Sequence, residues 1–208
     1  VYEFGRWERQ YFIAMEYIQG LPLDELINAV YGAGDRLSPG FAIDVLSQTC
    51  RGLRYAHDLV DDEGVRHQVI HRDLKPANLM LTTSSMVKVM DFGIAKSALQ
   101  LTKTMEGFTK GTPMYMSPEQ VAGDPLSPAS DIYTLGIVLF EMLTGSRLFA
   151  ADSLMQVIDK VSRSDVGDDL RRHVAQIGPL MPILERTLAR RPEDRFPSAV
   201  ALPEAFEE

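Results

Sequence analysis

The stretch "VIHRDLKPANLML", residues 69–81, places a histidine, an arginine, an aspartate, a lysine and an asparagine between two apolar runs. A segment selected for stability alone would bury apolar side chains here, because unpaired polar groups are costly to bury. Two short strands are predicted next, near residues 78–81 and 86–90, separated by the turn-like sequence "TTSS". The stretch is therefore predicted to be a polar loop that leads into a small sheet.

The composition describes an ordinary globular chain. Its 208 residues are 45% hydrophobic, which is enough to build a substantial core, and its formal net charge is -8. This negative charge argues against nucleic acid as a partner, because the field of the protein repels polyanions. The single cysteine, Cys50, cannot form an internal disulfide or a thiolate zinc site, and we expect it to be a small buried side chain.

No segment is predicted to cross a membrane. The most apolar run, residues 132–143, is too short to span a bilayer and contains Glu141. We therefore expect a cytoplasmic location and no membrane contact in this segment, while a longer parent protein could be anchored through other segments.

The first part of the chain reads as strands followed by helices. Residues 1–4 and 11–17 are predicted to form a hairpin around the charged turn "GRWER". Apolar residues then recur at helical spacing from Leu23 to Val30. Ser38 as N-cap and Pro39 at the first helical position predict a longer helix that ends near residue 59.

The second half is predicted to be helical around one central helix. Residues 131–144 are apolar on every face, which is typical of a helix buried in the centre of a helical domain. Smaller amphipathic helices are predicted within residues 154–161, 180–188 and 198–206. Residues 94–116 show little periodicity and are rich in Thr, Lys and Gly, so they read as a long loop of the kind that usually carries function.

Three motifs follow in a fixed order, "HRDLKPAN" (71–78), "DFG" (91–93) and "GTPMYMSPE" (111–119). In this order and spacing the chain resembles the eukaryotic-type (Hanks-type) protein kinases, and the cluster is far more specific than any one motif. With Lys75 two residues after Asp73, the first motif is similar to that of the serine/threonine branch of the family. The sequences "GTPMYMSPEQ" and "RRPEDRFPSA" are similar to bacterial members.

The resemblance implies an α+β, protein-kinase-like fold with a mainly helical large lobe and a remnant strand hairpin of the small lobe. Residues 1–18 would be the remnant of the small-lobe sheet and the hinge. Residues 19–208 would be the large lobe with its catalytic and activation loops. The implied activity is ATP-dependent phosphorylation of serine or threonine in protein substrates, with ATP and Mg²⁺ as cofactors.

The resemblance assigns the phosphoryl-transfer chemistry to five residues. Asp73 would orient the attacking hydroxyl, and Lys75 would lie against the transferring phosphoryl group as a point charge. Asn78 and Asp91 would bind magnesium through side-chain oxygens. Thr112 would bond to Asp73 and Lys75 and hold both in place.

The hinge sequence "MEYI" suggests where the adenine of ATP would lie. Met15 would limit the depth of the pocket, and backbone groups of Glu16 and Ile18 would bind the edge of the base. Met80 would form the apolar floor. Pro22 stands where many relatives present a carboxylate to the ribose, which leaves the ribose contact unassigned.

Other residues that match the family are expected to stabilise the fold rather than take part in the chemistry. His71 and Phe92 resemble members of the apolar stack that ties the two lobes together, and Asp131 resembles the buried carboxylate that accepts bonds from the backbone of the HRD motif. Glu119 and Arg195 resemble the long-range ion pair of the large lobe. The family usually has alanine where Ser117 stands, which is a conservative change.

Regulation is suggested by Arg72, next to Asp73, because a phosphorylated loop residue is the usual partner of such an arginine. Thr102, Thr104 and Thr109 lie in the long loop. We expect Thr104 or Thr109 to be phosphorylated in trans by another copy of the kinase. The alternative is that these threonines are only polar loop residues.

The chain contains no match to the glycine-rich phosphate loop, the third-strand lysine or its glutamate partner. Two explanations stay open: a fragment of a complete kinase with an N-terminal truncation, which we favour, or a short protein that serves as a pseudokinase-like interaction module or scaffold. We expect the isolated chain to be nearly inactive.

Overall fold

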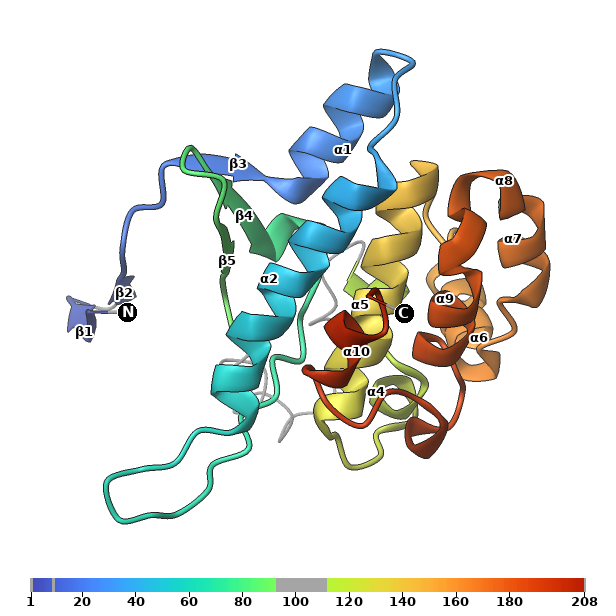
Figure 1. Cartoon of the computed structure of the whole chain (residues 1–208). Coiled ribbons are helices and arrows are strands. Elements are labelled where there is room, and N and C mark those ends of the chain that lie inside the picture. Colours follow the sequence, from blue (N-terminus) through green and yellow to red (C-terminus); the bar gives the residue numbers. More distant parts are fainter. Residues whose placement is uncertain (1, 9, 93–111, 208) are drawn as a thin grey trace.

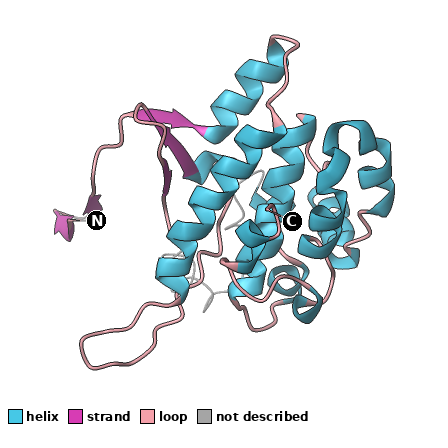
Figure 2. Ribbon diagram, in the orientation of Figure 1, coloured by secondary structure: helices cyan, strands magenta, loops and turns pink. Residues whose placement is uncertain are grey.

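The computed structural model describes residues 2–8, 10–92 and 112–207. These residues form a largely helical body with two small antiparallel sheets (Figure 2). The sheets lie at one side of the molecule and the helices make up the rest (Figure 1). This arrangement confirms the predicted α+β class with a dominant helical part.

The N-terminal hairpin exists, but the predicted turn and strand bounds are wrong. Strand β1 (Glu3–Trp7) pairs antiparallel with β2 (Gln10–Ala14), and Trp7 lies directly opposite Gln10. Most of the predicted turn "GRWER" is therefore strand, and the chain reverses at Glu8, which has a positive φ of 54°. The second strand ends at Ala14 rather than at residue 17. Aromatic and charged residues alternate here, so the pattern alone does not fix which residues turn.

A second sheet contains three strands in the order β3, β4, β5. Strand β3 (Gly20–Pro22) was not predicted, because it has three residues with Gly and Pro among them. It pairs antiparallel with β4 (Leu79–Thr82), which continues into β5 (Val87–Val89) as predicted. This sheet joins the end of the hinge to the segment that follows the HRD motif.

The first two helices confirm the sequence signals. Helix α1 (Leu23–Gly32) follows β3 directly and buries Leu23 and Ile27. Helix α2 (Pro39–His57) begins as predicted, because the Ser38 hydroxyl accepts a hydrogen bond from the Phe41 amide at 3.1 Å. That bond satisfies one of the amides left free at a helix start.

Helix α5 (Pro128–Thr144) is the centre of the fold. Every residue from 130 to 143 is buried, as the apolar pattern predicted. In Figure 1, α5 lies between α2 on one side and the later helices on the other. Helix α1 is also tied to it, because the Tyr31 hydroxyl donates to the carbonyl of Met142 at 2.9 Å.

The remaining helices pack around α5 and are short. Three-residue or four-residue 3₁₀ turns occur at η1 (Pro76–Asn78), η3 (Thr112–Tyr115), η4 (Gly178–Leu180) and η5 (Pro192–Asp194). The α-helices are α4 (Pro118–Ala122), α6 (Leu154–Arg163), α7 (Gly167–Arg172), α8 (Val174–Ile177), α9 (Met181–Thr187) and α10 (Ala201–Glu204). Within the described ranges, no helix has the length and apolarity needed to cross a bilayer.

Candidate active site

The polar loop between α2 and β4 brings three predicted site residues together. Lys75 Nζ lies 3.2 Å from Asp73 Oδ2, so the two charges form an ion pair. The Asn78 side-chain amide donates to the backbone carbonyl of Asp73 at 2.7 Å. Only 25% of the Lys75 side chain and 14% of the Asp73 side chain are exposed, so both lie in a partly dehydrated loop where a charge interaction is stronger than in water.

The backbone of this loop is hydrogen-bonded to Asp131, a buried carboxylate on α5. Its Oδ2 accepts hydrogen bonds from the His71 amide at 2.9 Å and from His57 Nε2 at 2.8 Å. Its Oδ1 accepts from the Arg72 amide at 3.1 Å. Both carboxylate oxygens are therefore satisfied, which a buried carboxylate requires.

His71 is fully buried and acts as a structural hydrogen-bonding ring. Its Nδ1 accepts from the Asp73 amide at 3.3 Å, and its Nε2 faces the carbonyl of Met90 at 2.8 Å. Burial lowers the pKa of His71 below its usual range, which fits a neutral ring that donates from Nε2. The ring also lies against Phe92, with centroids 4.6 Å apart, so the predicted contact of these two residues is present.

Asn78 and Asp91 offer oxygen ligands of the kind that Mg²⁺ prefers. Because the Asn78 amide nitrogen is bound to Asp73, its oxygen is the atom left for a metal ion. Asp91 is exposed and has a positive φ of 54°, a conformation that is uncommon for non-glycine residues and that aspartate tolerates better than most. The described residues contain no group of three or more His, Cys, Asp or Glu side chains that could hold a metal ion.

The predicted adenine residues lie on two neighbouring segments. Met80 is in β4 and pairs across the sheet with Lys88. Lys88 forms an ion pair with Glu16, which ties the segment before β3 to β5. Met15 is 48% exposed, and Ile18 is half-buried. The structure thus ties the segment that carries Glu16 to the sheet that carries Met80.

Several predicted residues cannot be compared with the structure. Thr102, Thr104 and Thr109 lie outside the described residues. The backbone of Thr112 begins η3, but its side chain also lies outside the description. Their predicted roles stay predictions.

The long-range ion pair is present and buried. Arg195 binds both oxygens of Glu119, with Nη1 to Oε1 at 2.7 Å and Nη2 to Oε2 at 2.9 Å. The Arg195 side chain is completely buried. This paired geometry is the one in which a guanidinium binds a carboxylate most strongly.

Two residues that contact the site were not singled out in the sequence. His57, at the end of α2, binds Asp131, and its position four residues after the buried Leu53 is the signal for its burial. Gln120 donates from its side-chain amide to the carbonyl of Arg72 at 2.8 Å. Ser117 and Gln120 fit the S-x-x-Q pattern of a capping box, which was a readable signal for the start of α4.

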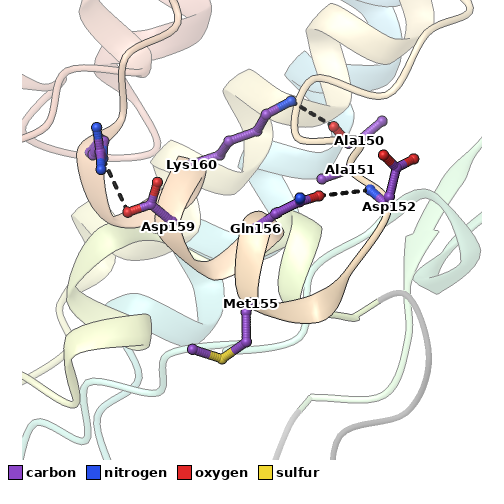
Figure 3. Close-up of a pocket in the computed structure, with 8 residues that line it drawn as sticks. Ala150, Ala151, Asp152, Met155, Gln156, Asp159 and Lys160 are labelled. Atoms are coloured by element: carbon purple, nitrogen blue, oxygen red, sulfur yellow. Dashed lines mark hydrogen bonds and ion pairs between the residues drawn. The ribbon is translucent and has the colours of Figure 1, made fainter.

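A surface pocket also occurs along α6, away from these residues. Figure 3 shows that its polar groups bind one another: Lys160 donates to the carbonyl of Ala150, and the Asp152 amide donates to Gln156. None of the predicted site residues lines this pocket. Several of its polar groups thus bind other residues of the same pocket.

The polar loop, the buried carboxylate that binds it and the mainly helical body are together typical of the protein-kinase-like fold. The chain belongs to this family: the family model "protein kinase domain" matches residues 1–206. Similar curated proteins are bacterial kinases. The tyrosine-protein kinase MasK of Myxococcus xanthus is 35% identical over 100% of the chain, and the serine/threonine-protein kinase PknB of Mycobacterium tuberculosis is 35% identical over 92% of the chain.

Solved structures agree on the fold. The crystal structure of the Mycobacterium tuberculosis PknI kinase domain matches 99% of the chain, with 26% identity and a TM-score of 0.67. The twitchin kinase region of C. elegans matches 93% of the chain, with a TM-score of 0.70 and 23% identity, and supports the fold alone. The protein-kinase-like fold and the bacterial serine/threonine resemblance are thus confirmed.

The chain is shorter than its relatives. It covers 32% of MasK, 29% of PknB and 68% of the PknI kinase domain chain. The chain thus spans about a third of the length of these curated relatives.

Proposed function

We propose that this chain is the large lobe of a kinase that transfers the γ-phosphoryl group of ATP to serine or threonine residues of proteins. The observation that carries the proposal is the arrangement of Asp73, Lys75 and Asn78 in one loop, with Lys75 3.2 Å from the Asp73 carboxylate. Phosphoryl transfer needs little covalent chemistry from the protein and depends on positioning and charge. This loop supplies both.

Each residue has a role that its contacts support. The Asp73 carboxylate would accept the hydrogen bond of the substrate hydroxyl and direct its oxygen at the phosphorus. Lys75 would neutralise negative charge on the transferring group. Asn78 and Asp91 would bind magnesium, which neutralises charge on the phosphates when bound. Thr112 would hold Asp73 and Lys75 in place.

We propose that the adenine lies between the hinge and β4. Backbone groups of Glu16 and Ile18 would bind its edge, Met80 would form its floor and Met15 would limit its depth. The ion pair between Glu16 and Lys88 supports this placement, because it holds the hinge against the sheet that contains Met80. Residues 1–18 would then serve as small-lobe sheet and hinge, and residues 19–208 as the large lobe.

We further propose that the protein is regulated by phosphorylation of Thr104 or Thr109 by a second copy of the kinase. Arg72 supports this proposal, since an arginine next to the catalytic carboxylate can bind the phosphate of a loop residue. Mass spectrometry of the full-length protein after incubation with ATP should find phosphate on one of these threonines. No phosphate between residues 94 and 116 would contradict it. Because ATP is the phosphoryl donor, we place the catalytic part in the cytoplasm.

A second candidate is transfer to tyrosine. It is favoured by the 35% identity to MasK, which is named a tyrosine-protein kinase and matches the whole chain. Lys75 argues for serine and threonine instead. Phosphoamino-acid analysis of the products of the full-length protein separates the two, because only the second candidate predicts phosphotyrosine.

The decisive experiment measures phosphate transfer from labelled ATP to a generic protein substrate by the full-length protein. Asp73→Asn should lower the rate by at least about 100-fold, the usual minimum contribution of a positioned acid-base group. Asp58→Asn, which removes an exposed carboxylate at the end of α2, is the matched control and should not change the rate. Equal absence of transfer in the wild type and in Asp73→Asn would support the alternative of a non-catalytic scaffold.

A further inference from the structure

The Gln120 side chain joins two segments of the site that are far apart in sequence. Its Oε1 accepts a hydrogen bond from the Ser117 amide at 2.9 Å, which closes the capping box of α4. Its Nε2 donates to the carbonyl of Arg72 at 2.8 Å. The side-chain amide is thus used at both ends, and these two partners fix which atom is oxygen and which is nitrogen.

The backbone of Arg72 needs this support. Its φ is 67°, in the left-handed region that non-glycine residues rarely occupy. Its amide donates to Asp131 on α5, and its carbonyl accepts from Gln120 on α4. Such a conformation persists when the surrounding structure holds it in place, and here two helices do so.

The bond to Gln120 acts on the peptide group that leads into Asp73. The carbonyl of Arg72 and the amide of Asp73 belong to one planar unit, so fixing both ends fixes the plane. Gln120 binds the carbonyl end, and His71 Nδ1 accepts from the Asp73 amide at 3.3 Å. The direction in which the Asp73 side chain leaves the backbone follows from the orientation of this plane.

We propose that Gln120 is a positioning residue for phosphoryl transfer: its side-chain amide sets the orientation of the peptide between Arg72 and Asp73 and thereby the aim of the Asp73 carboxylate. The inference rests on the proposed role of Asp73. It also links the start of α4 to the reacting group through a single hydrogen bond.

The identity of the residue supports this role. A capping box accepts glutamate as readily as glutamine, and glutamate has the favourable charge for a helix start. Glutamate, however, would place a carboxylate oxygen against the Arg72 carbonyl oxygen, where glutamine places a donor. Capping therefore does not require glutamine at residue 120, whereas the bond to Arg72 does.

Three variants of the full-length protein test the proposal. Gln120→Glu has the same shape and keeps the capping box but loses the donor to Arg72. Gln120→Met also loses the donor and adds no charge. Ser117→Ala removes only the hydroxyl that caps the Gln120 amide and leaves the bond to Arg72 in place. The rate of a single turnover at saturating ATP and substrate is measured by rapid quench, together with the KM for ATP and the melting temperature.

We expect Gln120→Glu and Gln120→Met to slow the single turnover by about tenfold or more, because small errors in the aim of a reacting group are costly. The KM for ATP should not change, and Ser117→Ala should keep the wild-type rate. A wild-type rate in both Gln120 variants would overturn the proposal. So would an equal loss in Ser117→Ala, or a loss that appears only together with a lower melting temperature, since either assigns Gln120 to stability. A wild type without any transfer would refute the proposed function itself.

Discussion

Replacing Arg195 with methionine should remove a buried side chain that makes five hydrogen bonds. Its guanidinium is completely buried, and all five of its N–H groups are used. Two bind Glu119, and the other three donate to backbone carbonyls of Ala129, Ala189 and Arg190 at 2.8 to 2.9 Å. Arg195→Met keeps an unbranched side chain in the same space and removes every one of these donors.

The expected cost follows from what the variant leaves behind. The Glu119 side chain is only 7% exposed, so without Arg195 its negative charge is buried and has lost its cation. Stranding one member of a buried ion pair typically costs about 3 to 5 kcal/mol. A domain has about 5 to 15 kcal/mol of stability in total, so we expect a large part of the free energy of unfolding to be lost at pH 7.

The pH dependence provides a sharper test than the magnitude. In the wild type, burial opposes the ionisation of Glu119, but hydrogen bonds from Arg195 and Ser130 outweigh it and hold the pKa below its ordinary value of 4.5. A lowered pKa stabilises the fold above the unfolded pKa, and this contribution is lost as the pH falls through the folded pKa. In Arg195→Met, the hydrogen bonds and the charge of Arg195 are lost, so burial, the largest influence, should raise the pKa of Glu119. The free energy of unfolding of the variant should then decrease as the pH rises from the unfolded pKa of Glu119 through its raised folded pKa.

Urea unfolding, followed by circular dichroism at pH 7 and at pH 5, measures both effects. The difference between the wild type and Arg195→Met should be smaller at pH 5. Arg191→Met is the matched control, because Arg191 lies in the same segment but forms only exposed ion pairs, and it should change stability little. Adding Glu119→Gln to Arg195→Met should recover part of the loss. A loss below about 1 kcal/mol at pH 7, or one that does not depend on pH, would refute the reasoning.

Two further outcomes are expected. Gly145→Ala should destabilise the protein more than Gly123→Ala in thermal unfolding: both glycines have positive φ, which costs alanine about 1 to 2 kcal/mol, but only at Gly145 would the new Cβ meet the ring of Tyr31, at 2.4 Å. Equal losses would contradict this. Cys50 should not react with a thiol reagent at pH 8 in the native protein and should react once urea unfolds it, because burial raises the pKa of its thiol to about 12. Rapid native labelling would show that this side chain is accessible.

The sequence predicted the helices whose signals are local. Ser38 and Pro39 start α2 through a hydrogen bond and a fixed φ that any context would preserve. Helix α5 was predicted from its apolar faces, because a helix without a polar face has no stable place at the surface. The turn of the hairpin was predicted wrongly and the short strand β3 was not predicted, because pairing with a partner strand decides both.

The site was predictable to the extent that it lies in one segment. The motif placed Asp73, Lys75 and Asn78 together, and the structure shows them in contact. The left-handed conformation of Arg72 and its bond to Gln120 were not predictable in this way. They depend on a contact between residues 48 positions apart, which a local pattern does not encode.

The position of Asp131 explains why the site can be so polar in so apolar a fold. A carboxylate buried on the central helix needs donors for both oxygens, and the loop before Asp73 and the end of α2 supply them. A change in the conformation of this loop would therefore leave Asp131 without its hydrogen-bond donors. Such a change is expected to affect both the stability of the core and the orientation of the Asp73 side chain. Gln120 adds a second support from α4, on the opposite end of the same residue, Arg72. The core thus fixes one end of Arg72 and α4 fixes the other, so under the proposed function a change in α4 is expected to alter phosphoryl transfer while the bonds to Asp131 stay in place.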